Sequence, residues 1–260
     1  MENTPKTPRG QRIGLFVTCL VDTMRPSVGF AAVKLLEQAG YKVEVPPTQT
    51  CCGQPNYNSG DNASTVTVAR SVIETFSGFD YVVSPSGSCA GMIKDHYVTL
   101  FDNDPEMKAK ADNLAIRTFE LTSFLIDVAR FSGDFSVSAS KITYHDSCSG
   151  LRELDVKQQP RELLSKHKEI TLIEGVEAEA CCGFGGTFCT KYPEISEQMV
   201  DRKVDDIIST GADMVLGGDL GCLMNIAGRL KRRNSNVKVR HVAELLAGQL
   251  DHPAIGEGSE

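Results

Sequence analysis

The stretch EACCGFGGTFC, residues 179–189, sets two cysteines side by side and places three glycines in the next four residues. Adjacent cysteines are poor disulfide partners, because a bridge between them would close a strained ring around one peptide bond. The pair has a counterpart, since TCCGQPNYNSG at residues 50–60 carries the same Cys-Cys-Gly sequence. This recurrence indicates an internal repeat.

Other segments repeat in the same order along the chain. DYVVSPSGSCAGM matches ADMVLGGDLGCLM, and YKVEVPPTQTCCG matches EITLIEGVEAEACCG. The cysteines in these segments correspond at nearly constant offsets, which are 129 residues for Cys19 and Cys148, 130 for Cys51 and Cys181, and 133 for Cys89 and Cys222. We therefore predict two homologous halves, at residues 12–131 and 139–250.

Within each half, short β-branched runs alternate with segments of helical spacing. In the first half GLFVT, KVEV, YVVS and LAIRT predict strands at 14–18, 42–45, 81–84 and 114–118. Helices are predicted between them at 26–40 and 62–78, each ending at a glycine, and in the second half at 159–167 and 193–211. Such alternation is typical of an α/β fold. We expect two tandem, pseudo-symmetric units, each a small parallel sheet flanked by helices.

Composition limits the class of protein. The 260 residues are 41% hydrophobic and 23% charged, which is typical of a globular chain. The net charge of −7 argues against nucleic-acid binding, which needs a basic face. No apolar run approaches the roughly 20 residues of a membrane span, and the polar start resembles no signal peptide. Nine cysteines in such a chain indicate a reducing compartment, so we expect a cytoplasmic protein.

The repeated cysteines all follow predicted strands. Because the carboxyl ends of parallel strands meet at one edge of a sheet, four thiols in each half are expected to converge. The predicted metal ligands are Cys19, Cys51, Cys52 and Cys89 in the first half and Cys148, Cys181, Cys182 and Cys222 in the second. Buried apolar cysteines are the plainer alternative, but the duplicated spacing argues against it.

Four thiolates form a soft, anionic site suited to zinc or to an iron–sulfur cluster. The adjacent pair favours a cluster, because neighbouring side chains of an extended segment point apart and can reach different metal atoms. Gly53 and Gly183 are expected to permit a left-handed backbone there and to bring N–H groups close to the sulfurs.

These motifs resemble the cysteine-rich CCG domain, which occurs in heterodisulfide reductase and in the iron–sulfur component of glycolate oxidase. TCCGQPNYNSG, YHDSCSGLREL, CCGFGGTF and GGDLGCLMNIAG most resemble the lactate-utilization branch, over nearly the whole chain. The resemblance implies an iron–sulfur subunit that passes electrons, together with two partner subunits, in the oxidation of L-lactate to pyruvate. The substrate and the partners follow from the resemblance alone.

The chain departs from the heterodisulfide reductase branch in its third cysteine segment. That branch has Cys-x-x-Cys there and carries noncubane clusters, whereas this chain has Ser86 and Asp219 at the first cysteine position. Four thiolates per half fit an ordinary four-iron cubane, in one or both halves. Alternatively, the oxygen of Ser86 or Asp219 is a weak ligand, or one iron is open.

Several other residues are weighed against plainer roles. Cys189 has no counterpart in the first half and is interpreted as a bystander thiol, with an extra ligand as the alternative. His145 could donate a hydrogen bond to a sulfur or shuttle a proton, although a partly buried histidine at a strand end is the favoured interpretation. His96, His167, His241 and His252 are expected at the surface or at helix starts.

Two further functions stay open. One is a thiol–disulfide reductase whose cluster does the chemistry, against which the missing fifth cysteine argues. The other is a structural module in which zinc ties each half together. Protein purified in air is expected to lose its clusters or to hold zinc, so zinc alone would not exclude a cluster.

Overall fold

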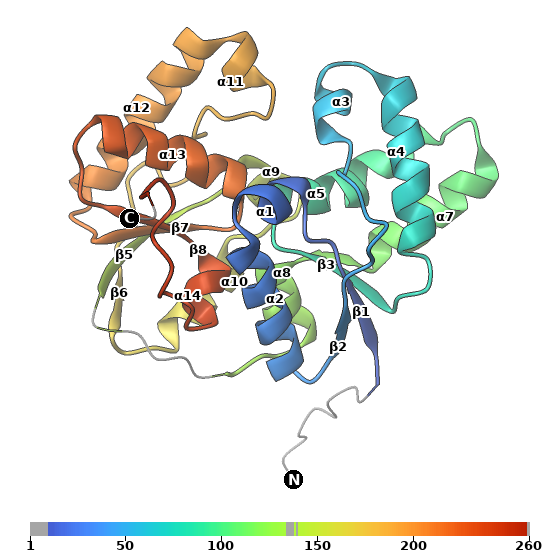
Figure 1. The fold of residues 1–260 in the computed structure, drawn as a ribbon, viewed down its shortest axis with the longest axis horizontal. Helices are drawn as coiled ribbons and strands as arrows, with labels where there is room; N and C mark the ends of the chain where they lie inside the picture. Colours follow the sequence, from blue (N-terminus) through green and yellow to red (C-terminus); the bar gives the residue numbers. More distant parts are fainter. Residues whose placement is uncertain (1–9, 134–137, 139, 259–260) are drawn as a thin grey trace.

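The computed structural model describes residues 10–133, 138 and 140–258. It contains two four-stranded sheets, one in each half, with helices around both (Figure 1). The strands of each sheet are all parallel. This arrangement confirms the predicted α/β class with two tandem units.

The first element of the first half is a strand of its sheet, and the last is a short π-helix. Its elements, in chain order, are β1 Arg12–Leu15, α1 Cys19–Met24, α2 Pro26–Gln38, β2 Lys42–Glu44, α3 Gln54–Asn58, α4 Asn62–Thr75, β3 Tyr81–Ser84, α5 Gly87–Gly91, η1 Met92–His96, α6 Tyr97–Leu100, α7 Pro105–Ile116, β4 Thr118–Glu120, α8 Leu121–Ser123 and η2 Phe124–Val128. Prolines at the starts of α2, α3 and α7 suit the first helical turn, where the missing N–H costs nothing.

The second half repeats this order with fewer helices. Its elements are β5 Ser140–His145, α9 Cys148–Arg152, α10 Gln158–Ser165, β6 Ile170–Leu172, α11 Phe188–Lys191, α12 Pro193–Ser209, β7 Met214–Gly217, α13 Leu220–Arg232, β8 Lys238–His241 and α14 Val242–Leu246. The strand orders are β2-β1-β3-β4 and β6-β5-β7-β8, so equivalent strands occupy equivalent places. In each parallel sheet the carboxyl ends of the strands lie at the same edge. The segments that follow these ends carry the cysteines.

One predicted strand was misplaced. The run LAIRT predicted a strand at 114–118, but α7 continues through Ile116 and β4 begins at Thr118. Leu114 and Ala115 are buried on the inner face of that helix. A short apolar run fits a buried helix face as well as a strand, and here the preceding helix start at Asp104 decided between them.

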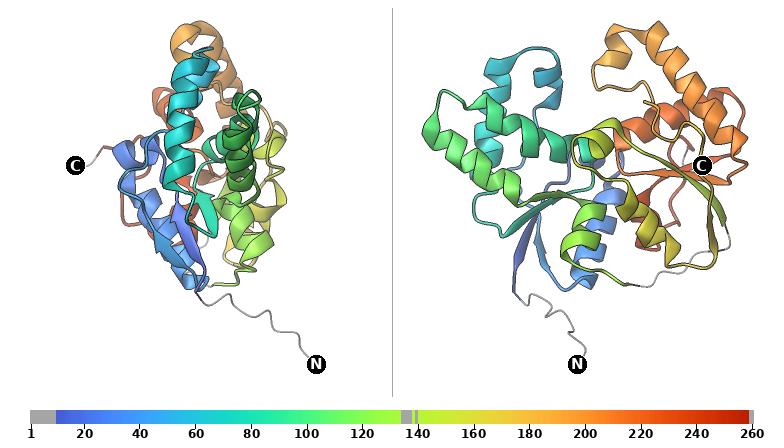
Figure 2. Two further views of the ribbon diagram at one scale, coloured as in Figure 1. Left: turned by 90° about the vertical axis from the view of Figure 1, so that its right-hand side faces the viewer. Right: turned by 180° about the vertical axis from the view of Figure 1, so that it is seen from behind.

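The two halves pack against each other through reciprocal helix pairs. Helix α2 packs on α14 and α8 on α10, while α1 packs on α13 and α5 on α9. The two contacts of each set are equivalent, because each helix of one half and its partner in the other occupy swapped positions of the repeat. A pseudo-two-fold axis between the halves produces this relationship. The right-hand view of Figure 2 shows the two sheets side by side, with helices of both halves meeting between them.

The interface between the halves is both apolar and ionic. One buried hydrophobic cluster runs from Leu35 and Phe124 in the first half to Leu163 and Val242 in the second. Beside it, Arg25 forms an ion pair of 2.8 Å with the fully buried Glu244. The halves therefore share a core rather than being joined by a free linker. None of the described helices is long and apolar enough to cross a bilayer.

Candidate metal centres

Four thiols of the first half converge as the sequence predicts. The sulfur of Cys19 lies 3.7 Å from that of Cys51, and the sulfur of Cys52 lies 3.4 Å from that of Cys89. Cys19 begins α1, the adjacent pair precedes α3, and Cys89 lies in α5, so three separate loops after strands supply them. Cys52 and Cys89 are buried, whereas Cys19 is exposed.

The second half assembles the equivalent group. Cys148 and Cys181 shift each other's pKa, as do Cys182 and Cys222, whose sulfurs lie within 4.8 Å of each other, so the pairing follows that of the first half. Cys182 and Cys222 are buried, while Cys148 is only half-buried. The repeat has therefore built two four-thiol groups at equivalent places of the fold.

The glycines after the cysteine pairs have the conformation that the sequence predicts. Gly53 and Gly183 both have φ of +81°, in the left-handed region that side chains with a Cβ rarely adopt. This conformation turns the N–H of Gly53 toward the sulfur of Cys51 and that of Gly183 toward the sulfur of Cys181, each over 3.4 Å. Each N–H stabilises negative charge on the sulfur.

One thiol of each group is therefore prepared to be a thiolate. Hydrogen bonds from Cys19, from Cys52 and from the Gly53 amide hold the pKa of Cys51 well below its ordinary value. Cys148, Cys182 and the Gly183 amide do the same for the pKa of Cys181. The thiolate is the form of cysteine that binds a metal.

A cavity of about 260 Å³ opens beside the first group, between the two halves. The residues Cys19, Cys51, Cys52, Cys89, Ser86 and Asp219, all selected from the sequence, line it. Phe184 and Thr187 of the second half close its other side. Among the described residues that line it, none is a lysine or an arginine, and Asp219 is the one carboxylate.

Ser86 and Asp219 meet across this interface. Both are about 5% exposed, and Oδ2 of Asp219 accepts hydrogen bonds from Ser86 Oγ and from the Ser88 amide, over 3.3 and 3.0 Å. Asp219 therefore caps α5 of the other half, and it makes no capping bond to its own helix α13. These two residues link the starts of the helices that carry Cys89 and Cys222.

His145 lies at the end of β5, beside the second group. One of its ring nitrogens and the sulfurs of Cys182 and Cys222 all lie within 4.8 Å of one another. The ring is 2% exposed, and burial lowers its pKa to about 3, so it is neutral. The prediction of a histidine at a strand end is confirmed. The ring is more deeply buried than predicted.

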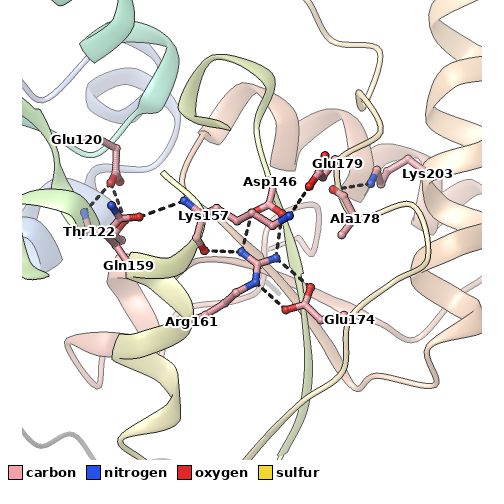
Figure 3. Close-up of polar contacts among 10 residues, drawn as sticks. All are labelled: Glu120, Thr122, Asp146, Lys157, Gln159, Arg161, Glu174, Ala178, Glu179 and Lys203. Carbon is pink, nitrogen blue, oxygen red and sulfur yellow. Dashed lines mark hydrogen bonds and ion pairs between the residues drawn. The ribbon is translucent and has the colours of Figure 1, made fainter. Parts of the chain in front are cut away.

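Asp146, next to His145 in the sequence, and Lys203, whose charge acts on His145, already have partners, which Figure 3 shows. Arg161 donates to both carboxylate oxygens of Asp146 over 2.9 Å and also pairs with Glu174. Lys203 donates to the carbonyl oxygens of Glu177 and Ala178, in the loop that leads to the second cysteine pair. These bonds fix the strand end and the loop that bring the ligands together.

Sequence reasoning missed Glu120 as a buried residue, and it placed His241 at a helix start without foreseeing its burial or its partner in the other half. Glu120 ends β4 and His241 ends β8, at equivalent places of the repeat, and both are almost fully buried. His241 begins α14 as expected, but its Nε2 lies 3.1 Å from the carbonyl oxygen of Pro85 in the other half. The signal was available, because the repeat aligns these two polar residues at the ends of equivalent strands.

Cys189 follows the second cysteine pair by seven residues. Its sulfur donates to the carbonyl oxygen of Gly186, 3.4 Å away within the same loop. This contact agrees with the interpretation of Cys189 as a bystander thiol.

The donors of both groups fit a soft metal. Each group has four sulfurs, two of them buried, with at least one sulfur favoured as a thiolate. Zinc and iron–sulfur clusters are the centres that such thiolate sets select. A model of the cysteine-rich CCG domain matches residues 13–94 and again 142–227.

The chain belongs to the cysteine-rich CCG-domain family.

Curated relatives within this family match the chain over nearly all of its length. It is 46% identical to lactate utilization protein A of Bacillus pumilus, over 90% of this chain and 98% of that protein. It is 47% identical to lactate utilization protein A of Shouchella clausii, over 90% and 98%. The same name belongs to a Halalkalibacterium halodurans protein at 48% identity, over 92% and 97%.

A solved structure has a similar fold despite low sequence identity. The crystal structure of a hypothetical protein from Helicobacter pylori aligns with all of this chain and 52% of its own, with a TM-score of 0.60. The two sequences are only 14% identical, so the likeness concerns the fold alone.

Proposed function

We propose that this protein is an iron–sulfur electron-transfer subunit of a multi-subunit system that oxidises L-lactate to pyruvate. The observation that carries the proposal is the four-thiol group, built twice at equivalent places by a family relative of lactate utilization protein A. The two functional halves would be residues 12–131 and 139–250, and the protein would work in the cytoplasm with two partner subunits.

The residues of this chain would hold and insulate the centres. The ligands of the first centre would be Cys19, Cys51, Cys52 and Cys89, and those of the second Cys148, Cys181, Cys182 and Cys222. A four-iron cluster, when bound, takes up and releases one electron without transfer of a proton or an atom. The Gly53 and Gly183 amides would stabilise the negative charge on Cys51 and Cys181.

The cavity supports a relay rather than a self-sufficient enzyme. Lactate is an anion, and a carboxylate needs arginine, lysine or several N–H donors to replace its water. The described lining has hydroxyl and amide side chains beside Asp219 and the four thiols, but no lysine or arginine. Lactate would therefore bind on one of the partners, and only electrons would reach this protein.

The test is the metal content of protein purified without oxygen. Absorption near 400 nm, with about four to eight irons per chain and equal acid-labile sulfide, is expected for one or two four-iron clusters. Protein that stays colourless after anaerobic reconstitution and holds stoichiometric zinc would instead support the structural module. Iron-loaded protein that reduces small disulfides without partners would support the thiol–disulfide reductase.

The partner system needs its own experiment. L-Lactate, with no dithionite present, should reduce the clusters only when the two partner subunits are added. It should fail to reduce them in this protein alone. Reduction by lactate in the absence of any partner would contradict the relay.

A further inference from the structure

The imidazole of His145 has an unusual place. It is 2% exposed, and neither ring nitrogen has a hydrogen-bond partner among the described residues. Buried polar groups are nearly always paired, because burying one without a partner costs its lost hydration. The ring lies against the sulfurs of Cys182 and Cys222, so any centre held by these sulfurs is its nearest neighbour.

Neighbouring charges do not account for the ring. Asp146, the next residue, gives both of its oxygens to Arg161. Lys203, a cation whose charge acts on His145, donates to two backbone carbonyl oxygens. With these groups already paired, the sulfurs of Cys182 and Cys222 are polar atoms within reach of an N–H of the imidazole.

The first half has no such group at the equivalent place. The offset of 129 residues that relates Cys19 to Cys148 relates Phe16 to His145. Phe16 is fully buried and packs in the hydrophobic cluster that contains Cys52 and Cys89. At this place the two four-thiol groups differ by an imidazole in the second half against a phenyl ring in the first.

We propose that His145 donates an N–H hydrogen bond to a sulfur of the second centre and raises its reduction potential above that of the first. The inference rests on the proposed function, because it needs an iron–sulfur cluster at both groups. Hydrogen bonds to cluster and thiolate sulfurs stabilise the reduced, more negative state. An electron passing from the first centre to the second would oxidise the first and reduce the second, with no bond broken.

The relative exposure of the two groups agrees with this direction. Cys19 is exposed, and the interface cavity reaches all four thiols of the first group. In the second group the equivalent Cys148 is half-buried. The accessible centre would exchange electrons with partners, and the centre beside His145 would hold them.

The experiment is an anaerobic redox titration of the full chain, followed by electron paramagnetic resonance, with iron and sulfide measured in every sample. His145→Phe copies the first half, His145→Gln keeps an N–H donor, and His252→Phe is the control because His252 is exposed. Histidine labelled with ¹⁵N in the unsubstituted protein tests the contact without any substitution.

Two transitions of different potential are expected in the unsubstituted protein. His145→Phe should lower the upper one, reducing its electron affinity about tenfold, which is 59 mV for a one-electron couple. His145→Gln should lower it less, and His252→Phe should leave both unchanged. Weak ¹⁵N coupling should accompany the upper transition and disappear in His145→Phe.

Three results would overturn the inference. Unchanged potentials in a fully iron-loaded His145→Phe protein would overturn it and leave the proposed function standing. A ¹⁵N coupling as large as that of a directly bound imidazole would show that His145 is a metal ligand and not a hydrogen-bond donor. A protein that accepts no iron at all would overturn the proposed function, and this inference with it.

Discussion

The hydroxyl of Ser86 donates a hydrogen bond to Oδ2 of Asp219 over 3.3 Å, although 133 residues separate the two in the chain. Each residue stands three positions before a cysteine of its half, Cys89 and Cys222, and immediately before the helix that carries it. The bond therefore joins the supports of the two candidate centres directly. Disturbing either half at this point should be felt by the other.

Replacing Asp219 should loosen this junction. Asp219→Ala removes the acceptor of the buried Ser86 hydroxyl and of the Ser88 amide, so we expect a loss of about 1–3 kcal/mol in the free energy of unfolding. Asp219→Asn keeps one acceptor oxygen and should lose less. Chemical denaturation measures both, with the exposed Asp251→Ala as control. Equal losses for Asp219→Ala and Asp251→Ala would contradict this role.

Glu120 should make stability depend on pH. Burial raises the pKa of its carboxyl from 4.5 to about 7. Between these values the folded state binds more protons than the unfolded state, so the free energy of unfolding falls as pH rises, by about 3 kcal/mol in all. Glu120→Gln should remove this fall. Denaturation at several pH values between 4.5 and 7 measures this fall, with the exposed Glu106→Gln as control. If the free energy of unfolding of Glu120→Gln fell with pH as it does in the unsubstituted protein, the assignment would be refuted.

The two left-handed glycines should differ in tolerance. A Cβ on Gly183 would lie 2.7 Å from the backbone oxygen of Ser196, whereas one on Gly53 would lie 3.3 Å from a methyl group of Val68. Alanine at either place strains the backbone by about 1–2 kcal/mol. Gly183→Ala should cost more, because a backbone atom moves less easily than a methyl group. Thermal unfolding of both variants is the measurement, and a larger loss for Gly53→Ala would count against the argument.

Arg161 should matter far more than an exposed arginine. Arg161→Met leaves the buried carboxylate of Asp146 without its partner, for which we expect a loss of about 3–5 kcal/mol. The matched control is Arg202→Met, which breaks the ion pair of an arginine side chain that is 72% exposed and should cost less than about 1 kcal/mol. Denaturant midpoints distinguish the two. Similar small losses would show that Asp146 does not depend on Arg161.

Removing a thiol should empty one half only. Cys182→Ala should lower the iron content of an anaerobic preparation by the share of one cluster, while the absorption of the other remains. Cys189→Ala should keep the full content, because that thiol bonds to Gly186 in its own loop. Iron and sulfide per chain provide the comparison. Loss of iron from Cys189→Ala would make it a ligand.

The repeat in the sequence predicted most of the fold. Offsets between cysteines placed two equivalent units, and β-branched runs before each cysteine placed the strands and their common edge. The prediction failed at residues 114–118, where one apolar run suits a helix face and a strand equally. Four cysteines per half could be grouped in advance, because parallel strands bring loops after their ends together.

The sequence by itself determined the two sheets, the eight clustered thiols and the left-handed glycines, since these depend on local pattern and on strand order within one half. Only the tertiary structure decided that Ser86 meets Asp219, that Glu120 and His241 are buried, and that His145 lies against two sulfurs without another partner among the described residues. Such contacts arise from how the elements of each half pack, how the two halves dock and which polar atoms this packing removes from water. No periodicity along the chain encodes them, because they join side chains that are far apart in the sequence.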